Sequence, residues 1–317
     1  MPGAVMRGER GDRGHRPEPP DSVQQLLVAL GQLVDQAVER IEFQRARVEL
    51  AVALQRHMLP PGLPELPGLH LAARYAPARD GLDVGGDWYD AFVMHDGSLG
   101  LTIGDVQGHD VEAIAFMGQV RTSLRALAQA TSDTREVLGR ANDLLIAMGV
   151  GRFATCCFLR FDPVTRDLTV SRAGHVPMVW ATAGGRYGIA LDNGGPPLGI
   201  VAGERYPVTH RRLTEAGALV LLTDGVVEGP HYPMESGLAE VAALVRAGFD
   251  ADPDVLASAV VKVADLTGHR DDAAVLAVCY DGPRDDDGPQ DDDGWHGFDG
   301  PHGFDSPQDH DGPDVPA

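Results

Sequence analysis

Four short segments of the sequence place aspartates where an apolar stretch meets a glycine or a turn. They are "VGGDWYDAF" with Asp87, "LTIGDVQGHD" with Asp105, "LVLLTDGVVE" with Asp224, and "GHRDDAAVLAV" with Asp271 and Asp272. The end of a buried strand is an unfavourable place for an unpaired carboxylate, because charge is poorly solvated there. One such aspartate is usually a turn residue that bonds its own backbone. Four in one chain predict that the fold gathers them into a cluster.

A carboxylate cluster needs compensating positive charge. Within these four segments the only basic residue is Arg270. Hard divalent cations are the natural alternative, because Mg²⁺ and Mn²⁺ prefer oxygen ligands. Two such ions about 3.5–4 Å apart can activate a water for attack on phosphorus. The sequence therefore predicts a site for two Mn²⁺ or Mg²⁺ ions.

The order of the apolar segments predicts an α+β fold. Strand-like segments between residues 69 and 106 precede two helical stretches, at about 111–130 and 134–148. A second run of strands follows, and two more helices, at about 237–247 and 254–267, precede a last strand from residue 273. Strand runs segregated from helix pairs favour two sheets with helices outside.

The motifs, taken in order, resemble a known family. The segments "LQRHMLP", "ARYAPA", "VGGDWYDAF", "IGDVQGHDVEA", "AGHVPMV", "GPPLGI", "LLTDGVVE" and "RDDAAVLAV" resemble the PPM-type (protein phosphatase 2C) serine/threonine phosphatases, in the SpoIIE-like bacterial branch of sigma-factor regulators. The resemblance covers about residues 54 to 280. It implies a two-sheet β-sandwich flanked by antiparallel helix pairs (α-β-β-α). It also implies hydrolysis of phosphoserine or phosphothreonine on a phosphorylated protein substrate, an anti-sigma-factor antagonist.

The resemblance also implies which residues hold the metal ions. They are Asp87, Asp105, the backbone carbonyl of Val106, Asp224 and Asp271, with Asp272 as the alternate to Asp271. Asp105 is the expected bridging ligand.

Other residues near these motifs have ordinary interpretations. Asp83 and Asp90 are expected at the surface or in turns. Asp110 replaces the glycine of the family's "GHG" and is well placed to cap a helix. His109 and His175 are predicted to be loop histidines that bond the backbone, rather than general acids.

The pattern of residues 22–57 predicts one long helix before the phosphatase domain. Its apolar positions form two heptad-like series with a one-residue shift between them: Val23, Leu26, Leu30 and Leu33, then Val34, Val38, Ile41, Val48 and Val52. Such a helix either covers its own domain or pairs with a second copy of the chain as a dimerising or signalling linker. About 58 residues are too few for a sensory module of the PAS, GAF or receiver type, which the resemblance would place there.

These segments predict four regions along the chain. Residues 1–20 are expected to be disordered, 21–58 to be the amphipathic helix and 59–281 the phosphatase domain. Residues 282–317, rich in Asp, Gly and Pro, are expected to be a disordered acidic tail, because they cannot bury enough apolar surface.

The net charge of −21 argues against binding to nucleic acid or to anionic membrane surfaces. The sequence shows no signal peptide and no apolar run of membrane-spanning length, so we expect a cytoplasmic protein. The three cysteines are expected to be small, reduced core residues. Two other functions remain open: a catalytically silent module that binds a phosphoprotein, and a phosphatase acting on small molecules.

Overall fold

The computed structural model describes residues 23–77, 85–108, 110–268 and 271–283. Its internal contacts divide the chain into two units, residues 1–49 and 50–317. The predicted disordered N-terminus, most of the acidic tail, Asp83 and His109 lie outside the described residues.

The described residues of the first unit form a helix with apolar side chains on its surface. Helix α1 (Val23–Met58) spans 36 residues, and its last residues belong to the second unit. Nine large apolar side chains between Leu26 and Phe43 are 47–64% exposed. The single long helix expected from the sequence is therefore present.

The second unit contains two five-stranded antiparallel sheets. Sheet A has the order β1-β10-β9-β6-β7 and sheet B the order β2-β3-β4-β5-β8. The strands of sheet A are β1 (Leu69–Ala76), β6 (Val179–Thr182), β7 (Tyr187–Ile189), β9 (Gly217–Leu222) and β10 (Ala273–Tyr280). Those of sheet B are β2 (Asp87–Val93), β3 (Leu99–Val106), β4 (Ala154–Phe161), β5 (Asp167–Ala173) and β8 (Thr209–Arg212).

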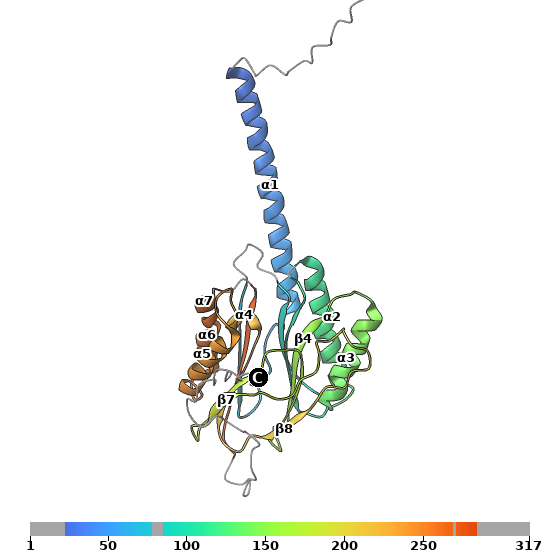
Figure 1. The fold of residues 1–317 in the computed structure, drawn as a ribbon, viewed down its shortest axis with the longest axis vertical. Coiled ribbons are helices and arrows are strands. Elements are labelled where there is room, and N and C mark those ends of the chain that lie inside the picture. The colour runs from blue at the N-terminus through green and yellow to red at the C-terminus, as the bar shows by residue number, and fades with distance from the viewer. Residues whose placement is uncertain (1–22, 78–84, 109, 269–270, 284–317) are drawn as a thin grey trace, which may run out of the picture. The chain divides into compact units, whose positions relative to one another are not determined.

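Along the strands of sheet B, successive side chains face two different cores in alternation. On β3, Leu101 and Ile103 face the core between the sheets, whereas Trp88 and Phe92 of β2 face a core that includes residues of α2 (Val111–Ala128) and α3 (Thr134–Met148). Outside sheet A, α5 (Met234–Ala247), α6 (Pro253–Val261) and α7 (Val263–Thr267) close a third core. The layers are therefore α-β-β-α, as Figure 1 shows, and the predicted fold class is confirmed.

The structure differs from the predicted elements in detail. The stretch expected as one helix at 254–267 is two helices, α6 ending at Val261 and α7 beginning at Val263, with Lys262 (φ −70°, ψ −13°) between them. Helix α7 then packs on α4 (Asp224–Val227), a one-turn helix that the sequence did not predict. The three-residue strand β7 was also not predicted, since so short a run has no measurable periodicity.

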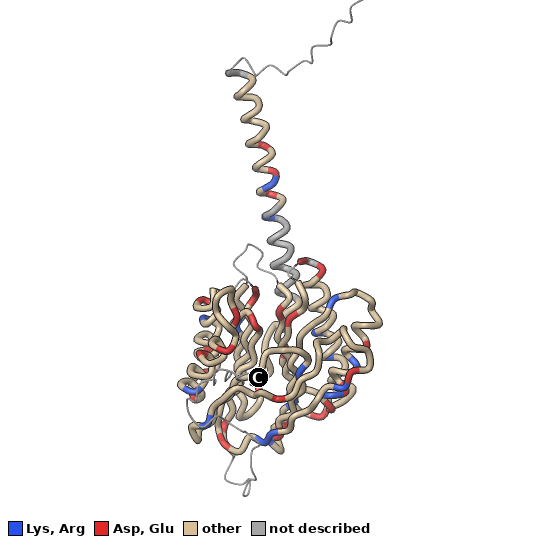
Figure 2. The backbone as a smooth tube through the Cα atoms, in the orientation of Figure 1, with Lys and Arg blue, Asp and Glu red and all other residues tan. Residues whose placement is uncertain are grey.

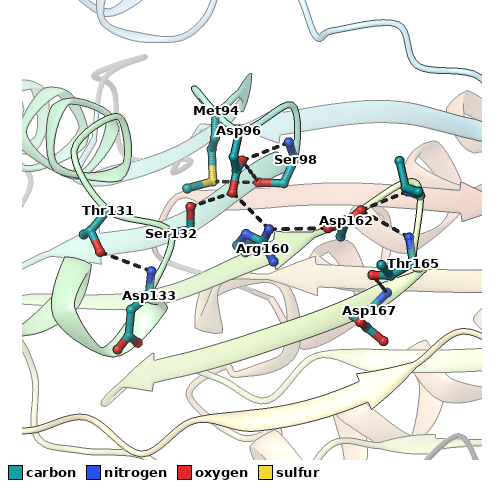
Figure 3. Close-up of polar contacts among 11 residues, drawn as sticks. Met94, Asp96, Ser98, Thr131, Ser132, Asp133, Arg160, Asp162, Thr165 and Asp167 are labelled. Carbon is teal, nitrogen blue, oxygen red and sulfur yellow. Dashed lines mark hydrogen bonds and ion pairs between the residues drawn. The ribbon is translucent and has the colours of Figure 1, made fainter.

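A polar network joins three turns of the sheet B layer (Figure 3). The Asp96 carboxylate, in the β2–β3 turn, accepts hydrogen bonds from Ser98, Ser132 and the Arg160 guanidinium. Arg160 also reaches Asp162 at 3.5 Å, in the β4–β5 turn. These bonds hold the pKa of Asp96 well below its usual range, although partial burial acts in the opposite direction. The network fixes the end of sheet B opposite to Asp87 and Asp105.

None of the helices in the described part of the chain has a stretch long and apolar enough to cross a membrane.

Candidate functional site

Two of the predicted aspartates meet at one end of sheet B. Asp87 opens β2 and stands directly opposite Asp105 near the end of β3 in the antiparallel register. Gly86 makes this end compact: a Cβ there would lie 2.5 Å from the carbonyl oxygen of Val106, so no larger residue fits. The structure therefore brings Asp87, Asp105 and the Val106 carbonyl together.

The other three aspartates lie at strand ends of sheet A. Strand β9 ends at Leu222, and Asp224 begins helix α4 two residues later. Asp271 and Asp272 directly precede β10, which pairs with β9. Gly225 lets helix α4 lie close to the start of β10, because a Cβ at that position would lie 1.9 Å from the carbonyl oxygen of Asp272.

A hydrogen bond joins the two sheets at this edge. The hydroxyl Oγ1 of Thr223, which is fully buried, donates to Oδ2 of Asp87 over 2.7 Å. Thr223 follows β9 in sheet A, and Asp87 belongs to sheet B. The site is thus built from both halves of the sandwich, and acidic residues are marked at this edge in Figure 2.

Burial and mutual repulsion raise the pKa values of three of these carboxyls, Asp87, Asp105 and Asp224. For Asp105, burial and the charges of Asp224 and Asp271 raise the pKa to about 8. The pKa of Asp87 is held well above its usual range, first by burial and then by the negative charges of Asp105 and Asp272. The hydrogen bond from Thr223 acts in the opposite direction. The pKa of Asp224 is raised by burial and by Asp271. Other carboxylates are the main charges acting on the cluster, so it has the electrostatic character of a cation site.

Asp271 and Asp272 contribute differently. Asp271 is exposed, and its charge acts on Asp105 and Asp224. Asp272 is 1% exposed and lies beside the Tyr75 hydroxyl, whose pKa is raised by burial and by the charges of Asp87 and Asp272. Both therefore lie at the cluster.

Asp90 is not the surface or turn residue that the sequence suggested. It is fully buried in β2, and its carboxylate lies 2.9 Å from Arg121 and 3.4 Å from Arg125 of α2. The Arg125 guanidinium also stacks 4.9 Å from the Phe92 ring centre. Asp90 shares its strand face with Phe92, so it points toward α2 and away from the cluster.

His175 lies in the loop after β5, as the sequence predicted, and it is buried. Its Nδ1 lies 2.8 Å from Oγ1 of Thr155, the residue opposite Asp105 on β4. Burial lowers the pKa of His175 to about 3, while the backbone of Leu222 acts in the opposite direction. The imidazole is therefore neutral near pH 7 and borders the cluster from between the two sheets.

Asp110 is a helix cap, as expected. Its carboxylate accepts from the Ala113 amide at 2.7 Å at the start of α2 and lies 2.8 Å from Arg152. Arg152 also donates to the Gln107 carbonyl, which fixes the segment after Val106.

The oxygen atoms of these residues are suitable ligands for hard divalent cations, but their side chains do not form a complete ligand shell. Within the described ranges, no three acidic, histidine or cysteine side chains already surround one point as metal ligands. Mg²⁺ and Mn²⁺ take oxygen donors and retain several waters, so few protein ligands per ion suffice. The carboxylates at this edge and the Val106 carbonyl are donors of that kind.

Thr223 and Tyr75 are residues of the site that the sequence reasoning missed. Both are neutral hydroxyls at the carboxylate cluster. The sequence signal was position, since Tyr75 lies within the segment "ARYAPA" and Thr223 within "LLTDGVVE", each near the end of a strand-like stretch.

Comparison with known proteins agrees with the fold and motifs. The family model "Stage II sporulation protein E (SpoIIE)" matches residues 95–281, more than half of the chain. The phosphoserine phosphatase RsbU of Bacillus subtilis is 24% identical over 185 residues, which cover 58% of this chain and 54% of RsbU. The chain spans about half or less of the length of the curated relatives it matches.

Solved structures give the same result. The RsbU and RsbW domains of Rv1364c from Mycobacterium tuberculosis match with a TM-score of 0.63 and 33% identity, covering 70% of this chain and 64% of that chain. The PP2C phosphatase domain of SpoIIE from Bacillus subtilis has the same fold, with a TM-score of 0.58 and 19% identity over 67% of this chain and 63% of that one. The chain therefore belongs to the SpoIIE family and has the PP2C-type phosphatase fold.

Proposed function

We propose that this protein is a metal-dependent serine/threonine phosphoprotein phosphatase, with two Mn²⁺ or Mg²⁺ ions and a phosphorylated anti-sigma-factor antagonist as substrate. The observation that supports this most directly is the gathering of five aspartates from both sheets at one edge, where burial and neighbouring carboxylates raise the pKa of Asp87, Asp105 and Asp224. The family membership and the name of RsbU support the phosphoserine chemistry.

In this proposal the chain's own residues have distinct roles. Asp87, Asp105, Asp224 and Asp271 would hold the ions, together with the Val106 carbonyl, with Asp272 as the alternate to Asp271. Asp105 would be the bridging ligand that the family resemblance implies; it stands opposite Asp87 on β2, and the charges of Asp224 and Asp271 act on it. When bound, the two ions supply charge compensation and a water of lowered pKa. The gathered carboxylates otherwise repel a phosphate ester, so the apo-protein is expected to be inactive.

The test is hydrolysis of p-nitrophenyl phosphate and of a phosphoserine protein of the antagonist class by the full chain. We expect activity with Mn²⁺ or Mg²⁺ and none with EDTA. The Asp105→Asn variant should lose turnover, whereas Asp254→Asn, which changes an exposed carboxylate on α6, should retain it. Full activity in metal-free buffer would refute the metal mechanism.

The substrate class is tested in the same assay. A preference for the phosphoprotein over free phosphorylated metabolites supports the protein phosphatase, and the reverse preference supports a small-molecule phosphatase. Tight binding of the phosphoprotein with no release of phosphate under any metal condition would indicate a silent binding module.

A further inference from the structure

Thr223 occupies the point where sheet A ends and the cluster begins. Leu222 is the last β9 residue paired with β10, opposite Val275. The next pair would be Thr223 and Ala274, and the Thr223 amide still donates to the Ala274 carbonyl at 3.1 Å. The reciprocal backbone bond is not made, because the chain turns into helix α4 and the Thr223 carbonyl accepts from Val226 instead.

The side chain of Thr223 takes the place of that missing backbone bond. The Ala274 amide donates to Thr223 Oγ1 at 2.9 Å. A buried amide without an acceptor is costly, so the hydroxyl stabilises the last pair of the ladder. This accounts for the hydroxyl residue that directly follows the apolar strand β9.

The same contact determines where the hydroxyl proton points. A hydroxyl has one proton to donate, and Oγ1 already accepts from Ala274. Its proton has two acceptors within reach: Oδ2 of Asp87 at 2.7 Å and the Ala274 carbonyl at 3.5 Å. The shorter bond, to a carboxylate, is much the stronger. Thr223 therefore donates to Asp87.

This bond orients a carboxylate that belongs to the other sheet. Asp87 is 1% exposed and Thr223 fully buried, so the bond is shielded from water. Fixing Oδ2 sets the side-chain rotation of Asp87 and leaves Oδ1 for the cluster. Removal of such a hydrogen bond to a metal-binding carboxylate typically weakens metal binding 10–100-fold.

We propose that Thr223 is a positioning residue that sets the divalent-cation affinity of the site by orienting Asp87 across the two sheets. This rests on the proposed function, since it assumes that Asp87 is a metal ligand. Thr223 touches neither substrate nor metal in this proposal, and it acts only through Asp87.

The experiment measures Mn²⁺ binding to the metal-stripped full chain by isothermal titration calorimetry, which does not depend on catalysis. Thr223→Val keeps the shape and removes the hydroxyl, Thr223→Ala is a second hydroxyl-free variant, and Thr223→Ser restores the donor. Thr134→Val is the matched control, because Thr134 is fully buried and its hydroxyl bonds Ser171 of β5 at 3.1 Å, between α3 and sheet B.

We expect Thr223→Val and Thr223→Ala to weaken Mn²⁺ binding about 10–100-fold. Thr223→Ser should bind within about threefold of the wild type, and Thr134→Val should bind unchanged even if its melting temperature falls. Near-UV circular dichroism identifies the variants that fold. If neither hydroxyl-free variant folds, Thr223→Ser decides: wild-type affinity supports the inference and a tenfold loss overturns it.

Other outcomes separate this inference from the proposed function. Equal Mn²⁺ affinity of wild type and a folded Thr223→Val would overturn the positioning role, while the phosphatase would stand. Absence of Mn²⁺ and Mg²⁺ binding to the wild type would overturn both.

Discussion

Asp87 and Asp90 lie three residues apart on β2 and both are buried, yet they have opposite electrostatic surroundings. Asp90 faces α2, where Arg121 and Arg125 neutralise it. Asp87 faces the other side of the strand, where it accepts from Thr223 and lies among other carboxylates. One strand thus presents a structural carboxylate on one face and a candidate metal ligand on the other.

Replacing Asp90 should destabilise the domain. Asp90→Asn leaves the Arg121 guanidinium, only 13% exposed, without its counter-charge. Breaking a buried ion pair from one side costs about 3–5 kcal/mol. We expect a loss of roughly 3 kcal/mol in urea unfolding, because the asparagine oxygen still accepts one hydrogen bond.

The matched control is Asp254→Asn, which breaks the exposed pair with Arg74. Exposed pairs contribute about 0–1 kcal/mol. Equal losses in the two variants would show that the Asp90 pair does not anchor α2 to sheet B.

The metal-free protein should lose stability as the pH rises from about 4 to about 8. The folded-state pKa of Asp105 is about 8, whereas an unfolded aspartate titrates near 3.9. In that window the folded state holds a proton that the unfolded state has released, so the free energy of unfolding falls with pH. The slope is up to about 1.4 kcal/mol per pH unit for one such carboxyl.

Asp105→Asn should flatten this slope in EDTA, stabilise the apo-protein near pH 8 and abolish turnover. Thermal unfolding across the pH range measures the first two effects, and Asp254→Asn should keep the wild-type slope. A wild-type slope in Asp105→Asn would mean that Asp105 is not repelled by its neighbours in the folded state.

The sequence was sufficient for features that depend on local patterns. Alternating segments and their glycine-assisted ends located Asp87, Asp105 and Asp224. The pairing of β2 with β3 brings Asp87 opposite Asp105, and the hydrogen bond from Thr223 to Asp87 joins the segment of Asp224 to them. The α-β-β-α layers followed from the order of strands and helices together with the family resemblance.

What the sequence could not give depends on distant partners. Asp90 was misjudged because Arg121 and Arg125 are more than thirty residues away and approach only when α2 packs on sheet B. Thr223 was missed because its importance comes from Asp87, 136 residues distant. Helix α4 is one turn long, too short for a periodic signal.

Deleting residues 284–317 should leave turnover and melting temperature nearly unchanged. Their composition predicts that they bury little apolar surface. The truncation keeps Asp281 and Gly282, whose carbonyls accept from Arg166. A large drop in melting temperature would show that the removed residues pack on the domain.

The exposed apolar side chains of α1 lead to the last prediction. A lone helix is marginally stable in water, and nine large apolar side chains exposed by 47–64% need a covering surface. The heptad-like spacing favours the same helix in a second subunit. We therefore expect the full chain to be a dimer by multi-angle light scattering.

The double substitution Val38→Glu, Ile41→Glu should dissociate this dimer and change phosphatase activity together with it. Both side chains are about half exposed, at 47% and 52%, so the charges cost little within one chain and act on a partner. The control is Gln32→Glu, Gln36→Glu, which adds the same charge at exposed polar positions of α1 and should leave the dimer intact. The expected change in activity rests on the end of α1 at Met58, whose sulfur lies against Gly118 of α2. A monomeric wild type would contradict the dimer, and unchanged activity in a dissociated variant would contradict a signalling role of α1.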